Sequence, residues 1–509
     1  MTTKVVKGTI WMMVGLTVPI FFSLFATPLN TRLLGVESFG LFVLILLIPA
    51  YFTFGDFGMN IASTKFGAAA FAEGSPDKEA RIVRTAAFIA ILFSFPFAIG
   101  LAIFSPNIVA IFNVPEHLAA EASLALKLAS VTYVINFLNG IFNTPELSRL
   151  RMDLNVMITS GFRLGGIIAT PLVIYLGGGV IGAVAVALAA SILTLTGHLI
   201  VSSRLLPELV GFTIDRESIR PMLRFGWSLV IAGVAAVLLV NLEKFVLTRA
   251  TSVETLAYYS IAATFAAMLT LFSASMVQSL MPAFSQLQRE QDRPALVALY
   301  SRGIRMTLFL LMPAVVVMVL GGKPFFTHWF GPDFGRESTG PFYITVAGIF
   351  FNVLAYFPYS AIMASGRSEI FARIYWIELV PYIGVVWVLS NRYGASGAAL
   401  AWSIRVVFDA ALLFYLASRM GVVFRGRKNF GFAILFSLMA VPIILLFAFD
   451  GLALIVLAAA IAAGSFYVWL VWAIMLDEDE IRMIREKLGQ LLAKTGLASR
   501  FGRDNSEAE

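Results

Sequence analysis

The sequence predicts an all-α integral membrane protein with about fourteen transmembrane helices, arranged as two parallel six-helix repeats plus an extra C-terminal helix pair. Three observations predict this class: an apolar composition, fourteen apolar runs long enough to span a membrane, and internal repeats in a fixed order. Hydrophobic residues make up 59% of the 509 residues, charged residues only 13%, and the mean hydropathy is +0.87. Because a soluble domain has about 25% charged residues, most of this chain is expected to face lipid or a bundle interior.

The fourteen apolar runs follow one another with short loops between them. A membrane core requires roughly 20 apolar residues per helix. The first run is too long for a signal peptide and has no small-residue cleavage site before polar sequence, so we expect it to stay as a helix. The predicted spans are 9–30, 39–62, 85–105, 119–143, 156–176, 179–203, 222–247, 256–282, 304–321, 341–365, 370–391, 396–418, 430–449 and 452–476.

The positive charges of the loops predict the orientation of these spans. Lys and Arg stay on the cytoplasmic side of short loops. With the N-terminus inside, 28 Lys and Arg residues fall in inside segments and only five in outside loops. One missed span would invert every later loop, so this asymmetry supports fourteen spans and two cytoplasmic termini. The net charge of +7 has the same origin and does not indicate nucleic-acid binding.

A repeated segment predicts an internal duplication. TRLLGVESFGLF at 31–42 matches TRATSVETLAYY at 248–259, and both fall on outside hairpins, after spans one and seven. Further matches occur at nearly the same offset, namely Pro106 and Phe112 with Pro324 and Phe330, and Gly179, Gly182, Ala183, Ser203 and Arg204 with Gly394, Gly397, Ala398, Ser418 and Arg419. Parallel repeats of this kind are typical of transporters that bind substrate between the halves.

The repeats predict four parts of the chain. They are an N-terminal six-helix bundle over 1–213, a second six-helix bundle over 214–425, an additional helix pair over 426–476, and a cytoplasmic segment over 477–509. The last segment is expected to form an amphipathic helix on the cytoplasmic surface, because apolar residues at helical spacing oppose a basic face. The residues after this helix are expected to be disordered.

The repeated hairpin also has a local explanation. Gly35 or Ser252 can cap the next helix, and Thr251 with Glu254 fits a capping box. Arg32 and Arg249 end the preceding helices, where a long cationic side chain can reach the membrane surface. This structural interpretation is the favoured one, and a role of these residues in a gate is the alternative.

Five segments carry a family pattern: RLLGVESFGLF (32–42), DFGMNIASTKF (56–66), FGWSLVIAGVAAVLLVNLEKFVLTRATSVETLAYYSIA (225–262), LMPAFSQLQ (280–288) and YGASGAALA (393–401). In this order and spacing they resemble bacterial polysaccharide flippases, the O-antigen, exopolysaccharide and teichoic-acid exporters of the multidrug/oligosaccharidyl-lipid/polysaccharide (MOP) superfamily. The resemblance covers about residues 5–425, and the last helix pair is similar to the fourteen-helix branch that includes peptidoglycan lipid flippases.

The resemblance implies a fold, a substrate and a location. In this family two halves form a V around a central cavity and rock between inward-open and outward-open states. The implied substrate is an undecaprenyl-pyrophosphate-linked oligosaccharide, flipped from the cytoplasmic to the periplasmic leaflet of the bacterial inner membrane. The expected partners are this lipid-linked oligosaccharide, membrane lipids, and a polysaccharide polymerase with glycosyltransferases. We expect a monomer without a cofactor, and not an enzyme.

Ionisable residues inside spans are costly and are therefore candidates for function. Lys65 ends span two at the predicted inner mouth, where it is either a substrate contact or one more inside charge. Arg163 lies deep in span five, where it either binds an anionic headgroup or pairs within its bundle. The remaining candidates for a gate or for ion coupling are Arg32, Asp56, Glu243, Lys244, Arg249 and Glu378.

Other polar residues in the spans have weaker assignments. Arg405 and Asp409 are spaced for an ion pair on one helix face, and Lys127 is expected to reach the outer surface. Asn136, Asn139 and Asn143 recur on one face of span four, and Asn352 matches Asn136 in the other repeat. Their amides suit sugar hydroxyls, but they equally suit hydrogen bonds between helices.

Three alternative functions leave different signatures. The sequence has no cysteine and its three histidines are far apart, so a metal or redox site is not expected. A multidrug antiporter of the same superfamily would usually have a carboxylate in the first span of a half. The span 9–30 contains none, and the second half offers only Glu243, near the outer end of its span. A major facilitator transporter should show a Gly-x-x-x-Asp-Arg signature in the loop after span two, which 65–81 lacks. A membrane-embedded ligase or polymerase needs a large outer loop, and the longest spans only 322–340.

Overall fold

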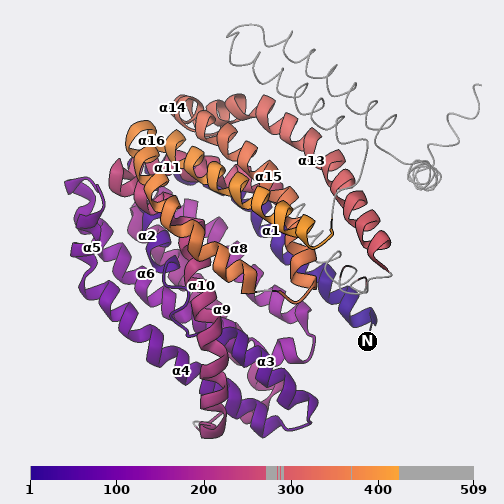
Figure 1. The fold of residues 1–509 in the computed structure, drawn as a ribbon. Coiled ribbons are helices and arrows are strands. Elements are labelled where there is room, and N and C mark those ends of the chain that lie inside the picture. The colour runs from indigo at the N-terminus through magenta and orange to yellow at the C-terminus, as the bar shows by residue number, and fades with distance from the viewer. Residues whose placement is uncertain are drawn as a thin grey trace, which may run out of the picture. The chain divides into compact units, whose positions relative to one another are not determined.

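The structure is a computed structural model that describes residues 2–211, 213–270, 284, 287, 292–367 and 369–422. The described residues are almost entirely helical and include no strand, as the predicted fold class requires (Figure 1). The helices are α1 (Thr2–Leu34), α2 (Val36–Ala50), α3 (Met59–Ala72), α4 (Pro76–Ile103), α5 (Ser105–Ile111), α6 (Glu116–Phe142), α7 (Thr144–Ser148), α8 (Met152–Val173), α9 (Gly179–Leu205), α10 (Arg216–Ala250), α11 (Val253–Ala266), α13 (Arg293–Trp329), α14 (Pro332–Glu337), α15 (Thr339–Ala364) and α16 (Glu369–Arg419).

The first twelve predicted spans coincide with these helices, apart from residues 271–282, which lie outside the described part of the chain. Seven of the described helical segments are long and apolar enough to cross a membrane, and two of them, Met152–Leu205 and Arg373–Arg419, each contain two predicted spans. The extra helix pair over 426–476 and the segment over 477–509 also lie outside the described residues.

One predicted span is not a continuous helix, so this prediction is wrong. A turn over residues 51–58 divides the span predicted over 39–62 into α2 and α3. Phe57 and Gly58 both have left-handed backbones, with φ of 55° and 71°, and a left-handed residue ends a run of helical hydrogen bonds. The Asp56 carboxylate accepts hydrogen bonds from the N–H groups of Gly58 at 2.9 Å and Asn60 at 3.0 Å. Asp56 therefore caps the start of α3.

The described residues form two compact units, and these differ from the predicted halves. The first unit consists of Met1–Phe265, Pro324–Thr345 and Ser368–Arg405. The second consists of Ala266–Lys323, Val346–Arg367 and the residues after Arg405. Within the second unit, the ring of Tyr300 packs edge-on against Phe357 with centroids 6.2 Å apart. The two units are defined by contacts between residues, whereas the two halves are defined by the repeated sequence. The predicted boundary near residue 213 is therefore not tested and stays a prediction.

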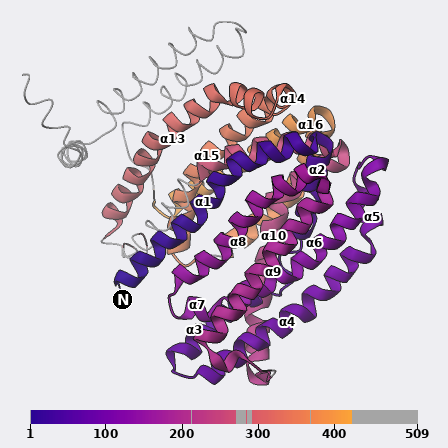
Figure 2. The same ribbon diagram turned by 180° about the vertical axis from the view of Figure 1, so that it is seen from behind.

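Long helices lie side by side in the first unit. In Figures 1 and 2, α4, α6, α8 and α9 run next to one another, with α6 packed against α4 and α9, and α8 packed against α1 and α9. A core shared by α2, α4, α6 and α9 includes Leu41 and Ile45 of α2, Leu126 of α6 and Val184 of α9, all fully buried. These buried apolar faces fix the helices whose other faces form the cavity described below.

Positions that match in the repeat share local structure. Gly179 and Gly394, which are 215 residues apart, have nearly the same unusual backbone, with φ, ψ of 55°, −153° and 53°, −130°. Glycine is the residue that adopts such a conformation at little cost. Phe112 and Phe330, another matched pair, are each only 5% exposed. These similarities are what a duplication of one structural unit would produce.

The two copies of the repeated hairpin contact each other within the first unit. A Cβ on Gly40 of α2 would lie 1.9 Å from the carbonyl oxygen of Val253, at the start of α11. Asn113 donates hydrogen bonds from its side chain to the carbonyls of Arg249 at 3.1 Å and Thr251 at 2.8 Å. The second hairpin therefore depends on a glycine and an asparagine of the N-terminal bundle.

The hairpin caps are only partly as predicted. The Ser252 hydroxyl accepts a hydrogen bond from the N–H of Thr255 at 3.2 Å, so Ser252 caps α11 as expected. The Thr251–Glu254 capping box is wrong, because the Glu254 carboxylate instead accepts a hydrogen bond from the Tyr258 hydroxyl at 3.0 Å. Arg32 and Arg249 lie in the last turns of α1 and α10, as predicted.

Gly40→Ala is expected to destabilise the protein by about 1–3 kcal/mol, the usual cost of overpacking a close contact. The new methyl group requires the α2 and α11 backbones to separate, because the Val253 carbonyl occupies its position. Thermal unfolding in detergent measures the effect. Gly100→Ala in α4 is the matched control, since its added methyl group would have no neighbouring atom within 4 Å and alanine favours a helix. Equal melting temperatures for the two variants would contradict the close contact.

Candidate functional site

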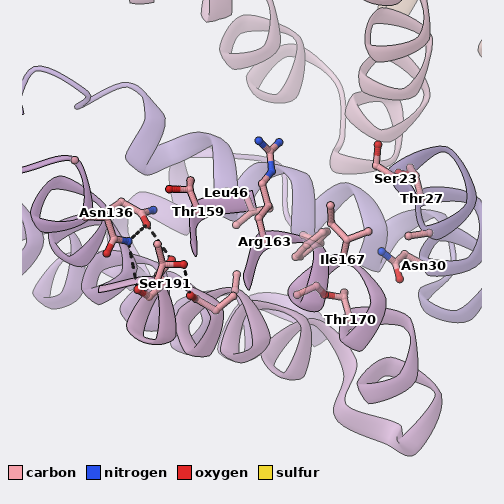
Figure 3. Close-up of a pocket in the computed structure, with 18 of the residues that line it drawn as sticks. Ser23, Thr27, Asn30, Leu46, Asn136, Thr159, Arg163, Ile167, Thr170 and Ser191 are labelled. Atoms are coloured by element: carbon pink, nitrogen blue, oxygen red, sulfur yellow. Dashed lines mark hydrogen bonds between the residues drawn. The ribbon is translucent and has the colours of Figure 1, made fainter. Parts of the chain in front are cut away.

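A cavity of about 620 Å³ lies within the N-terminal bundle, between α1, α2, α6, α8 and α9 (Figure 3). Its walls carry small and uncharged polar side chains at helical spacing, so the helices present polar faces to the same space. The polar lining residues are Ser23, Thr27, Asn30, Asn136, Asn139, Asn143, Thr159, Arg163, Thr170, Ser191, Thr194 and His198. None of the described residues that line it is Asp or Glu. The cavity can therefore receive a hydroxyl-rich or anionic group.

The three asparagines predicted on one face of span four all line this cavity. The side-chain oxygen of Asn136 accepts a hydrogen bond from the Ser191 hydroxyl at 2.9 Å, and the amide of Asn139 donates to the Ser191 carbonyl at 3.3 Å. The side-chain oxygens of Asn30, Asn139 and Asn143 are buried and have no hydrogen-bond partner in the described part of the chain. A buried acceptor without a partner is costly, so these oxygens are suited to accept hydrogen bonds from a ligand.

Arg163 projects into the middle of the cavity. Figure 3 shows it between Asn136 and Ser191 at one end and Ser23, Thr27 and Asn30 at the other. It is the only Lys or Arg among the described lining residues, and no ion pair or hydrogen bond of its guanidinium is present within the described structure. The alternative prediction, an ion pair within the bundle, is therefore not supported. A guanidinium presents paired donors that match a phosphate.

A buried pair beside the cavity was not predicted from the sequence. His198 of α9 is 1% exposed, and its Nδ1 lies 2.9 Å from a carboxylate oxygen of the fully buried Glu146. Its Nε2 lies 3.2 Å from the hydroxyl of Thr159, which lines the cavity. The sequence separates the His and the Glu by 52 residues, so no local motif could have indicated the pair.

Lys65 lies in a different place from Arg163. It is exposed on α3, and its ammonium group is 4.1 Å from the ring centroid of Phe225 and 5.6 Å from that of Phe66. It lines a second hollow, formed by α3, α4 and α10, and does not line the cavity. The structure therefore does not bring the two predicted substrate contacts together.

Two of the predicted gate residues connect helix ends in the first unit. The Arg32 guanidinium at the end of α1 donates a hydrogen bond to the carbonyl of His328 at 2.6 Å. Close to it, the Trp329 indole donates to the carbonyl of Leu24 at 3.1 Å. The side chain of Arg249 is exposed, and its backbone carbonyl accepts a hydrogen bond from the side-chain amide of Asn113. The first two contacts join α1 to the end of α13, and the third joins the end of α10 to the loop before α6, on the predicted outer side.

Glu243 lies in a buried polar cluster. It is 2% exposed and accepts hydrogen bonds from the hydroxyls of Tyr259 at 3.3 Å and Tyr382 at 3.1 Å. Arg405 stacks over the ring of Tyr382 at 5.4 Å and lies 3.7 Å from the carboxylate of Glu378. Arg405 thus forms an ion pair across the break at Gly394, whereas the same-face pair with Asp409 that the spacing suggests stays a prediction.

The other candidates have simpler surroundings. The Lys244 ammonium donates a hydrogen bond to the side-chain oxygen of Asn241 at 3.2 Å. The carbonyl of Asn241 accepts a hydrogen bond from the Tyr51 hydroxyl at 2.7 Å, which connects α10 to α2. Lys127 is exposed on α6. Asn352 lies on α15 in the second unit and is not among the residues that line the cavity.

Comparison with known proteins identifies related sequences. The profile of the polysaccharide biosynthesis protein family matches residues 5–288. A Shigella flexneri protein named for O-antigen transport is 24% identical over 428 residues, which cover 83% of this chain and 99% of its own. The uncharacterized membrane protein EpsK of Bacillus subtilis (strain 168) is 22% identical over 403 residues, covering 77% of this chain and 79% of its own.

Solved structures share the fold. The lipid II flippase MurJ in an inward closed conformation superposes with a TM-score of 0.71 and 15% identity, covering 92% of this chain and 99% of its own. An inward-facing MATE family transporter of the MOP superfamily gives a TM-score of 0.60 and 17% identity, covering 81% of this chain and 98% of its own. These similarities confirm the predicted all-α transporter fold.

Proposed function

Because the chain belongs to the polysaccharide biosynthesis protein family and has the fold of MOP superfamily transporters, we propose that it flips a lipid-linked oligosaccharide across the membrane. The substrate is an oligosaccharide on undecaprenyl diphosphate, which moves from the cytoplasmic to the periplasmic leaflet by alternating access. The protein lies in the bacterial inner membrane with both termini in the cytoplasm. Glycosyltransferases supply the substrate, a polymerase uses it afterwards, and the flippase itself breaks no covalent bond.

The composition of the cavity supports this substrate. Its described lining contains one arginine, no carboxylate and a row of asparagines. A diphosphate must leave water to cross the membrane, and a guanidinium inside the protein offsets part of that cost through charge-assisted hydrogen bonds. The unpartnered oxygens of Asn30, Asn139 and Asn143 can accept hydrogen bonds from sugar hydroxyls. One site can thus bind both the phosphate and the sugar.

The same composition disfavours a multidrug antiporter. An organic cation in this cavity would face Arg163 without a carboxylate among the described lining residues to balance it. Like charges in a site of low polarity repel each other strongly. The resemblance to MATE transporters concerns the fold alone and says nothing of the charge of this cavity.

Reconstitution into liposomes tests the proposal directly. The purified protein is incorporated with a fluorescent undecaprenyl-diphosphate oligosaccharide, and a membrane-impermeant quencher is added outside. We expect the protected fraction to disappear at a rate that rises with the amount of protein. Empty liposomes and an unrelated helical membrane protein are the controls. Export of cationic dyes without movement of the lipid would favour the antiporter and reject the flippase.

A further inference from the structure

The second hollow combines cationic and aromatic side chains. It occupies about 1,090 Å³ between α3, α4 and the first turns of α10. Lys65, Arg220 and Arg224 contribute three positive charges, and none of the described lining residues is acidic. Aromatic rings form most of the remaining wall, namely Phe57, Phe66, Phe93, Phe225 and Trp227. A cationic hollow with aromatic walls matches an anionic group attached to an apolar chain.

The rings of the aromatic wall stack on one another. Phe57 stacks between two rings, with its centroid 4.6 Å from that of Phe93 and 5.8 Å from that of Trp227. A Cβ on Gly226 would lie 2.0 Å from the carbonyl oxygen of Phe57, so α10 reaches this wall only because residue 226 is glycine. These contacts hold α10 against the turn before α3.

Phe57 adopts a strained backbone to occupy this position. Its φ of 55° is positive, a conformation that costs a bulky residue roughly 1–2 kcal/mol. Such strain persists where the surroundings enforce it, and it is frequent at binding sites. The stacking with Phe93 and Trp227 and the contact with Gly226 provide that enforcement. The positive φ of Phe57 is thus retained because these contacts hold its ring in the aromatic wall.

Among the described residues, no acidic side chain pairs with the positive charges of the hollow. No ion pair or hydrogen bond of the Arg220 or Arg224 side chain is present within the described residues, and Lys65 contacts only the faces of aromatic rings. A diphosphate diester carries a negative charge on each phosphate, whereas a phospholipid diester carries one on a single phosphate. Three cations around one hollow therefore complement a diphosphate better than a single phosphodiester.

We propose that this hollow is the cytoplasmic docking site for the diphosphate of a polyprenyl-linked substrate, before the substrate reaches the cavity around Arg163. This proposal rests on the proposed function. Lys65, Arg220 and Arg224 bind the phosphates, and the aromatic wall contacts the first isoprene units of the chain. The hollow and the cavity share no lining residue, so docking and transport are separate steps with separate cationic groups.

Equilibrium binding tests the docking site without requiring transport. The full-length protein is placed in phosphatidylcholine nanodiscs and titrated with a fluorescent polyprenyl diphosphate. The Lys65→Gln/Arg220→Gln/Arg224→Gln variant is expected to bind about 100-fold more weakly, because each surface cation contributes roughly a factor of five to binding an anionic lipid. The Arg81→Gln/Arg204→Gln/Arg216→Gln variant loses the same charge at positions outside the hollow and should bind as the unchanged protein does.

The competitors identify the ligand. Polyprenyl monophosphate and phosphatidylglycerol should each compete at least about tenfold less well than the diphosphate, because they offer fewer charges to the three cations. Equal competition by phosphatidylglycerol would overturn the diphosphate assignment and make the hollow a phospholipid site. Equal binding by the two triple variants, both with unchanged melting temperatures, would overturn the docking site itself.

The flipping assay distinguishes failure of docking from failure of the proposed function. Unchanged diphosphate binding by the hollow variant, with normal flipping, would reject only the docking site. Absence of both binding and flipping in the unchanged protein would reject the proposed function, on which the docking site depends. Weakened binding with slower flipping at low substrate concentration, recovering at high concentration, is the expected result.

Discussion

Arg163→Gln is expected to slow flipping of the lipid-linked oligosaccharide by about 10- to 100-fold. A hydrogen bond to a charged group is worth roughly 1.5–3 kcal/mol, which corresponds to that range of rates if the contact forms during crossing. Glutamine retains a hydrogen-bond donor but removes the charge that, in the proposed function, offsets dehydration of the diphosphate. The measurement is the initial rate at which the fluorescent substrate becomes accessible to the quencher in liposomes.

Two further variants define what Arg163 contributes. Arg163→Lys keeps the charge but loses the planar pair of donors, so we expect an intermediate rate. Lys127→Gln removes an exposed cation from α6 outside the cavity and should leave the rate unchanged. The melting temperature of Arg163→Gln should also be unchanged, because no described contact of the guanidinium supports the fold. Flipping by Arg163→Gln at the unchanged rate would reject its assignment to the substrate site.

The side of a helix on which polar residues recur was predictable from the sequence. Asn136, Asn139 and Asn143 repeat at the spacing of one helical face, and the structure places all of them on the cavity wall. Arg163 was predictable for a related reason, since a charge deep in an apolar span is retained only where it faces a partner or a polar space. In both cases a local pattern carried the information.

Features that depend on the packing of distant helices were not predictable. The hollow combines Lys65 with two arginines that are more than 150 positions away in the sequence, and only the packing of α10 against α3 brings them together. The break at Phe57 lies within a largely apolar run whose only charged residue is Asp56 and which is long enough for one span, so hydropathy alone does not indicate the break. Glu146 and His198 likewise meet only because α7 packs against α9.

The two arginines after α7 show that the surroundings of a charged residue were not predictable from the sequence either. In the sequence, Arg149 and Arg151 are equivalent cytoplasmic charges, as the positive-inside pattern predicts. In the structure they differ. Arg149 is 16% exposed and forms two parallel hydrogen bonds, at 2.8 and 3.1 Å, with the fully buried carboxylate of Glu79. Arg151 is 47% exposed and pairs with Asp153, which is itself partly exposed.

Arg149→Ala is therefore expected to destabilise the protein by about 3–5 kcal/mol, the usual cost of leaving a buried charge without its partner. The mutation removes contacts with several helices. The guanidinium of Arg149 also stacks over the ring of Phe71 in α3 at 4.6 Å and donates a hydrogen bond to the carbonyl of Pro145 in α7 at 3.1 Å. The mutation thus loosens α3, α4 and α7 together. Reversible unfolding in mixed detergent micelles measures the free energy of unfolding.

Arg151→Ala is the matched control, because it removes the same charge two residues away. Its pair with Asp153 is exposed, and such pairs contribute about 0–1 kcal/mol. The Glu79→Gln/Arg149→Met double variant should recover much of the stability lost in Arg149→Ala, since the unfavourable buried charge is then absent. A loss in Arg149→Ala no larger than in Arg151→Ala would show that the buried Glu79 carboxylate does not depend on Arg149. A double variant as unstable as Arg149→Ala would instead assign the loss to packing against Phe71.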